Sequence, residues 1–279
     1  MTIRNASAGD VEQLADLAHE HRIRQQGWDP EFWAMSPSAR QLYPMLLHLL
    51  LERTAGVSLV SESRGRIDGY LFASAAPNPR DEKRHLWVVD DLGVSSPKSW
   101  HTVGPALLAA AAARGRDGVA AAMVVACPHH DHDRALMLIA SGFTANCWFR
   151  TRRIDDRRGN TPATDDDGST DLPLPHLHGL TAEMAGAALV DVAGGGGLLS
   201  GSIAPDALSG HVATTALADP VVATGREATI RLLGELEARC RARGDATLMV
   251  ACGPGEPMLD DVLDERGYTR PVDWHLLPW

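Results

Sequence analysis

The stretch Val125-Ala126-Cys127-Pro128, followed by Gly142-Phe143, decides the fold because it returns later in the chain. The second copy reads Val250-Ala251-Cys252-Gly253 and is followed by Gly267-Tyr268. In both copies the glycine comes fifteen residues after the cysteine. Self-similarity of this kind is typical of a duplicated structural unit.

The segments around the two cysteines also match. Each cysteine ends an apolar run that is typical of a buried strand; the runs are Ala121–Ala126 and Thr247–Ala251. An Ala- and Arg-rich helix is predicted before each run and a Trp-containing strand after each Gly-aromatic pair. These are Ala106–Arg114 with Cys147–Arg152, and Ile230–Arg243 with Asp273–Leu277. Further upstream, Gly65-x-x-x-Gly69-Tyr70-Leu71 is paired with Gly197-x-x-x-Gly201-Ser202-Ile203. The sequence therefore predicts two copies.

A polar segment separates the copies. Residues 155–175 are rich in Asp, Gly, Pro, Ser and Thr, which is typical of an exposed linker. We therefore expect a first domain over residues 1–154 and a second over residues 176–279. The second is truncated at its start, where Leu180–Ala188 replaces residues 1–57.

Hydrophobic periodicity predicts the order βααβββαβαβ for the first domain. The fold class is α/β (α+β), with two tandem mixed-sheet domains of which the second is shortened. The predicted elements are Thr2–Ala6, Asp10–His21, Ala39–Arg53, Ser58–Ser63, Ile67–Ala75, Leu86–Val94, Gly104–Arg114, Ala121–Cys127, Asp133–Ser141 and Asn146–Ile154.

Composition excludes several classes of protein. The 279 residues are 44% hydrophobic and 22% charged, as in globular proteins, and the formal net charge is −10. Without clustered Lys and Arg, no nucleic-acid partner is expected. The apolar runs are shorter than the roughly 20 residues of a membrane span, and residues 1–20 lack the apolar segment of a secretory leader. Four scattered cysteines predict neither a disulfide framework nor a zinc site. We expect a cytoplasmic protein.

The element order, with a strand, a glycine turn into a helix and a late Gly-Phe, resembles the GNAT superfamily of acyl-CoA N-acyltransferases. The resemblance covers nearly all of the first copy and the last two-thirds of the second. In tandem members usually one half carries the chemistry. In the second copy Glu227 lies in the loop Thr224–Thr229, where a carboxylate would repel phosphate. The second copy is therefore predicted to be a pseudo-domain.

The resemblance implies a pantetheine arm that lies between two splayed strands and pairs with the backbone of the fourth strand. It also implies a pyrophosphate at the start of the next helix, where backbone N–H groups bind anions. Only Gly104 matches the family's glycine-rich pattern, and Pro105 removes a donor. An ordinary strand–loop–helix is the alternative. The residues implied to bind the donor are Leu92, Gly93, Val94, Lys98, His101, Thr102, Val103, Gly104 and Ala106.

The resemblance also places a carboxylate base three residues before the valine of the fourth strand, which is Asp91, with Asp90 beside it. A base needs a shifted pKa, which burial in a cleft would provide. Solvent exposure of both acids is the alternative.

The family's acidic tyrosine is absent, since Leu138 and Leu263 occupy its positions. His129 or His130, in the run His129–Asp133, could replace it because histidine titrates near neutral pH. The alternative is a solvent-facing loop in which Asp133 caps the next helix. Adjacent histidines rarely converge on one ion, so no metal is expected.

Four aromatic residues are candidates to contact the acceptor; they are Trp28, Trp33, Tyr43 and Tyr70. They suit an interface between the halves equally well. The main hypothesis is an N-acyltransferase that acts on a small-molecule amine. The donor would be acyl-CoA or an acyl group on the phosphopantetheine of a carrier protein. The other hypothesis is a non-catalytic protein that binds CoA or a metabolite.

Overall fold

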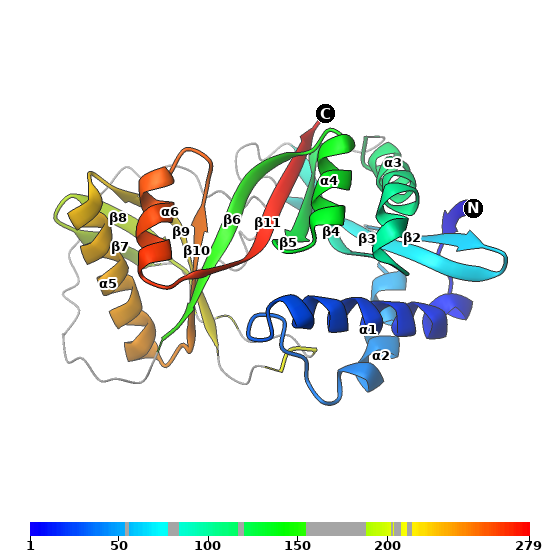
Figure 1. Ribbon diagram of the computed structural model, residues 1–279, viewed down its shortest axis with the longest axis horizontal. Helices are drawn as coiled ribbons and strands as arrows, with labels where there is room; N and C mark the ends of the chain where they lie inside the picture. The colour runs from blue at the N-terminus through cyan, green and yellow to red at the C-terminus, as the bar shows by residue number, and fades with distance from the viewer. Residues whose placement is uncertain are drawn as a thin grey trace. The chain divides into compact units, whose positions relative to one another are not determined.

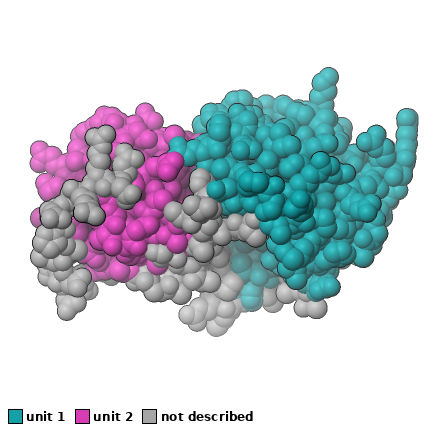
Figure 2. Space-filling view, turned by 90° about the horizontal axis from the view of Figure 1, so that it is seen from below, with its two compact units in different colours: residues 1–145, 206–211, 274–279 teal, residues 146–205, 212–273 magenta. Residues whose placement is uncertain are grey.

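The computed structural model divides the chain into two compact units (Figure 1). Unit 1 comprises Met1–Ala145, Asp206–His211 and Trp274–Trp279, and unit 2 comprises Asn146–Pro205 and Val212–Asp273. Figure 2 colours the two units separately. The structure describes residues 1–53, 56–77, 84–116, 120–154, 188–201, 203, 208–210 and 214–279.

The division differs from the predicted boundary near residue 154, because segments distant in sequence complete unit 1. The predicted linker, residues 155–175, lies outside the described residues.

Unit 1 has a mixed sheet of strand order β1-β2-β3-β4-β5. The first four strands pair antiparallel, whereas β4 and β5 run parallel. The C-terminal segment extends this sheet, since the Trp279 N–H donates to the Ala121 carbonyl at 3.0 Å. The bounds are β1 Thr2–Asn5, β2 Gly56–Ser63, β3 Arg66–Pro77, β4 His85–Val94 and β5 Ala120–Pro128.

Helices cover both faces of the unit 1 sheet, because successive strand residues point to opposite faces. On β3, Tyr70 and Phe72 pack with α1 and α2, whereas Leu71 and Ala73 pack with α3 and α4. Figure 1 shows α1 and α2 as a layer apart from α3 and α4. The bounds are α1 Val11–Trp28, α2 Ala39–Leu51, α3 Val103–Arg116 and α4 His132–Ala140.

The C-terminal end of α1 and the N-terminal end of α4 differ from the sequence prediction for physical reasons. α1 continues beyond His21 to Trp28, because Gln25 is buried one turn later and bonds the His21 ring at 3.2 Å. α4 begins at His132, and its N-cap is Asp131 rather than Asp133. The Asp131 carboxylate accepts the Arg134 backbone N–H at 3.2 Å, the usual capping interaction.

Unit 2 repeats the element order that unit 1 has from β2 onward. Its strands follow the order β6-β10-β9-β8-β7, with β9 and β10 parallel. The core lies between this sheet and α5 and α6. The bounds are β6 Thr144–Arg153, β7 Ala188–Val192, β8 Gly195–Leu199, β9 Thr215–Ala223, α5 Arg226–Arg243, β10 Thr247–Cys252, α6 Pro257–Glu265 and β11 Thr269–Pro278.

The hairpins of the two units correct one detail of the predicted repeat. In unit 1 the β2–β3 turn holds Arg64 and Gly65, both with positive φ (52° and 75°), as type I′ turns require. In unit 2 the β7–β8 turn holds Gly194 (φ 86°). Gly65 therefore corresponds to Gly194 and not to Gly197. The sequence alone could not distinguish the two, because residues 194–197 are all glycine.

Candidate functional site

Strands β4 and β5 of unit 1 separate toward their carboxyl ends, as the resemblance to acyltransferases implied for two neighbouring strands. The last paired residues of β4 and β5 are Val89 and Val125, whereas β4 continues to Val94. Residues 91–94 of β4 are therefore paired on one side only, with β3. This leaves an unpaired backbone edge beside the end of β5.

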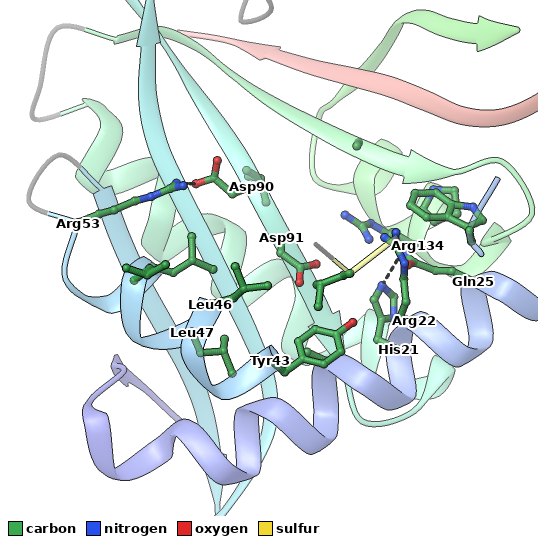
Figure 3. A pocket seen from close by; sticks show the side chains of 18 residues that line it. His21, Arg22, Gln25, Tyr43, Leu46, Leu47, Arg53, Asp90, Asp91 and Arg134 are labelled. Atoms are coloured by element: carbon green, nitrogen blue, oxygen red, sulfur yellow. Dashed lines mark hydrogen bonds and ion pairs between the residues drawn. The ribbon is translucent and has the colours of Figure 1, made fainter. Parts of the chain in front are cut away.

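A β-bulge in β4 places both predicted acids at this separation. Phe72 pairs with Asp91 and Ala73 pairs with Val89, so Asp90 is an extra residue without a partner on β3. Adjacent strand residues normally face opposite sides of a sheet, and a bulge interrupts that alternation. Asp90 and Asp91 consequently line the same cavity (Figure 3).

The cavity has a volume of about 380 Å³ and lies within unit 1. Helices α1 and α2 form one wall, and β4, the end of β5 and the start of α4 form the other. The lining residues are Ala18, His21, Arg22, Gln25, Trp33, Tyr43, Leu46, Leu47, Leu49, Leu50, Arg53, Val89, Asp90, Asp91, Ala126, Pro128, Arg134 and Leu208.

Asp91 is the better placed of the two carboxylates for acid–base chemistry. Its Oδ2 accepts the Tyr70 hydroxyl at 2.9 Å, and its Oδ1 accepts the Leu92 N–H at 2.8 Å. Burial raises the pKa of Asp91, and the hydrogen bond from Tyr70 and the charges of Arg134 and Arg22 oppose the shift. A raised pKa is what a general base requires near neutral pH.

Asp90 lies in a more open environment. Its carboxylate pairs with the Arg53 guanidinium at 3.2 Å and accepts the Ser74 hydroxyl at 3.1 Å. Burial also raises the pKa of Asp90, although 29% of its side chain is exposed. The alternative of two exposed acids therefore describes Asp90 better than Asp91.

A basic cluster forms the end of the cavity opposite Asp90 (Figure 3). His21 and Gln25 come from the part of α1 at and beyond its predicted end. Arg22 stacks on Trp33, with 4.8 Å from Cζ to the ring centroid, and the buried Arg134 lies 5.2 Å from the Trp100 ring. None of His21, Arg22, Gln25 and Arg134 belongs to the site residues that the sequence predicts.

The unpaired edge of β4 is covered by side chains of the same unit. Arg134 donates to the Leu92 carbonyl at 3.1 Å, and Arg24 donates to the Val94 carbonyl at 2.6 Å. The Leu92 N–H donates to the Asp91 carboxylate. A pantetheine arm would have to displace these contacts in order to pair with the strand.

The predicted phosphate-binding loop is partly helical. Residues Pro97–His101 form a 3-10 helix that buries Trp100 in the core. Lys98, His101 and Thr102 are exposed at the start of α3. His101 Nε2 lies 3.7 Å from Asp133, a pair exposed to solvent. These residues remain candidates to hold phosphate.

Gly104 has a packing role. A Cβ at this position would lie 3.1 Å from Met137 Cε, and Val103 packs on Gly69 of β3. Val103 and Gly104 are both buried, whereas Ala106 is half-buried. The Val103 side chain therefore packs in the core, position 104 has little room for a side chain, and only the backbone of these two residues could contact a ligand.

The other predicted residues divide between the cavity and its surroundings. Trp33 and Tyr43 line it, whereas Tyr70 lies behind Asp91 and Trp28 is outside the lining. His129 and His130, whose ring centroids are 5.2 Å apart, also lie outside the lining, in the turn before α4.

Among the described residues, no group of three His, Cys, Asp or Glu side chains is arranged to hold a metal ion. In the same part of the chain, no helix is both long enough and apolar enough to cross a membrane.

Unit 2 has a smaller cavity of about 210 Å³, lined by the end of β9, the first turn of α5 and the start of α6. β9 and β10 pair only as far as Ala218 and Val250, and β9 continues to Ala223. Glu227, in the first turn of α5, has 94% of its side chain exposed. The lining residues are Val221, Val222, Ala223, Thr229, Gly255, Glu256, Pro257, Met258 and Leu259.

No protein-family model matches the sequence, and no curated protein does. Solved structures match the fold. A Pyrococcus horikoshii protein provisionally named an acetyltransferase aligns over 100% of this chain and 89% of its own, with a TM-score of 0.50 and 13% identity. The PaiA N-acetyltransferase of Thermoplasma acidophilum, solved with coenzyme A, covers 52% of this chain and 89% of its own, at 14% identity and a TM-score of 0.43. The chain therefore has an acetyltransferase-like fold.

Proposed function

We propose that the protein is an N-acyltransferase that uses a pantetheine thioester to acylate a small-molecule amine bound in the unit 1 cavity. The observation that carries the proposal is Asp91. It is a carboxylate of raised pKa, and it lies in the cavity at the point where β4 separates from β5. The shared fold supports the same conclusion.

The reaction follows from these positions. The acceptor loses one proton to solvent and attacks the thioester carbonyl carbon as a neutral amine. The Asp91 carboxylate takes the second proton from the nitrogen as the bond forms. A C–N bond forms, the C–S bond breaks, and the thiolate leaves with its electron pair. The thiolate then takes a proton from solvent or from a side chain, because Leu138 and Leu263 occupy the positions of the family's acidic tyrosine. Tyr70 holds the Asp91 carboxylate in place through its hydroxyl.

The donor would lie along residues 92–94 of β4 once Arg134 and Arg24 release the strand carbonyls. Acyl-CoA would place its phosphates near Lys98, His101, Thr102 and the first turn of α3. An acyl carrier protein would need no adenosine diphosphate site, which suits a loop without the family's glycines.

A specific observation favours a second candidate, the non-catalytic binding protein. The Leu92 carbonyl, the Leu92 N–H and the Val94 carbonyl are all bonded within unit 1. A protein that only binds a metabolite in the cavity would keep these contacts and release no thiol.

Thiol release separates the two functions. The full chain is incubated with acetyl-CoA, or with an acetylated carrier protein, and a panel of primary amines, and thiol formation is followed against amine-free and protein-free controls. We expect amine-dependent release above both controls. Absence of release with every donor, together with calorimetric binding of an amine, would establish the binding protein instead.

A further inference from the structure

Three arginines surround His21 at the basic end of the unit 1 cavity; they are Arg22, Arg24 and Arg134. Among the residues that the structure describes, none of the three has a carboxylate oxygen within ion-pair distance. Arg24 and Arg134 instead donate to backbone carbonyls, and Arg22 stacks on Trp33. The cluster therefore lacks a direct counter-ion.

Burial makes the missing counter-ion costly. Arg134 is only 4% exposed, and its buried Nε has no hydrogen-bond partner, although the residue lines the cavity. The Nε of Arg22, which also lines the cavity, is buried and unpartnered too. Buried polar and charged groups are nearly always paired in folded proteins. Two adjacent guanidinium groups with unused donors are suited to receive an anion.

The charges facing the cluster indicate what kind of anion fits. Among the described residues, Asp91 and Asp131 are carboxylates whose charges interact with these arginines. His21 is kept neutral, because burial and the three arginines lower its pKa well below the usual value. The three arginines outnumber these two carboxylates, which favours the binding of an added anion such as a carboxylate.

We propose that the cavity binds an α-amino acid with an apolar side chain. Its carboxylate would lie on Arg22 and Arg134, and its amine would lie at Asp91. This inference rests on the proposed function, for which it names the acceptor class. The ligand's side chain would lie against Tyr43, Leu46 and Leu47. These residues lie between the Asp90–Arg53 pair and the basic cluster (Figure 3). A volume of about 380 Å³ is at the small end of ligand pockets, as an amino acid requires.

Calorimetry without any donor tests the inference. The probes are L-leucine, L-phenylalanine and L-tryptophan, each compared with the amine that lacks its carboxylate: 3-methylbutylamine, phenethylamine and tryptamine. We expect at least one amino acid to bind about tenfold or more tightly than its amine, because its carboxylate would accept hydrogen bonds from charged arginines. Equal binding of each pair, or no binding of any amino acid, overturns the inference.

Variants locate the carboxylate. Arg22→Met should remove the preference for the amino acid over its amine, and Arg22→Lys should restore part of it. Arg40→Met is the matched control, because Arg40 is exposed on α2 and pairs with Asp16. The buried Arg134→Lys serves as a second variant, with its fold checked by circular dichroism. An unchanged preference in both Arg22→Met and Arg134→Lys overturns the inference.

The outcomes for the two proposals can be distinguished. Amino-acid binding that depends on Arg22, with no thiol release, would support this inference and refute the transferase. Thiol release with the amines at the same efficiency as with the amino acids would support the transferase and refute this inference.

Discussion

Replacing Asp91 by asparagine should separate catalysis from stability. The substitution keeps the shape of the side chain and removes the proton acceptor. General base catalysis contributes about 10²–10⁴-fold to a rate, so kcat for amine acylation should fall by that factor. Donor affinity should change little, because the Asp91 carboxylate lines the acceptor cavity.

The free energy of unfolding should respond very differently. Burial raises the pKa of Asp91, so the folded state binds the proton more tightly than the unfolded state does. The ionised carboxylate therefore lowers stability at neutral pH, and asparagine removes that cost. Against this, the 2.9 Å bond from Tyr70 loses its ionic acceptor, a loss of about 1 kcal/mol. The two effects oppose each other, so the unfolding free energy should stay within about 1 kcal/mol of the wild-type value.

The assay combines thiol release with urea denaturation, and Asp90→Asn is the matched control because Asp90 occupies the bulge beside Asp91. Activity requires the ionised Asp91, so it should be present above the raised pKa and fall as the pH drops through it. That acidic limb should be missing from the residual activity of Asp91→Asn. Full turnover in Asp91→Asn would refute the assignment of the base, as would a loss of turnover found only in Asp90→Asn.

Three further substitutions test the scaffold by chemical denaturation. Asp10→Asn should lower stability by about 1–2 kcal/mol at pH 7, since the hydrogen bond from half-exposed Arg4 lowers the Asp10 pKa to about 2. This stability difference should shrink as the pH falls toward that value. A stability difference that does not change with pH would contradict the ion pair. Gly93→Ala should cost about 1–3 kcal/mol and also reduce thiol release, because a Cβ there would lie 2.6 Å from the Tyr70 ring; wild-type stability would contradict the close contact. Glu237→Gln should cost about 3–5 kcal/mol, because the buried Glu237 is the counter-ion of several arginines of unit 2; a loss below 1 kcal/mol would show that the pairs contribute little.

Periodicity was enough to predict most of the strands and helices, because each element buries a regular set of apolar residues. The separation of β4 from β5 beyond Val89 and Val125 could be expected only from the resemblance to acyltransferases. Asp91 was found by its place on the strand before Val94. The bulge at Asp90 has no such signal, since its register is set by pairing with β3 and not by local sequence.

The basic end of the cavity escaped prediction for physical reasons. Arg134 occurs in a helix, where arginine is normally solvent-exposed, yet it is buried here by Trp100 and the edge of β4. His21 and Gln25 are polar residues at helical spacing and indicate no buried face until their mutual hydrogen bond is known. Leu208 reaches the cavity from a segment remote in sequence, which no local pattern could place.

The packing of Trp279 next to Ala121 and Gly115 has a consequence for how unit 1 folds. Residues 274–279 complete unit 1, so this unit cannot finish folding until the chain as far as Trp279 has been synthesised. A fragment of residues 1–154 would leave one edge of β5 unpaired, and unpaired strand edges tend to pair with other chains and aggregate.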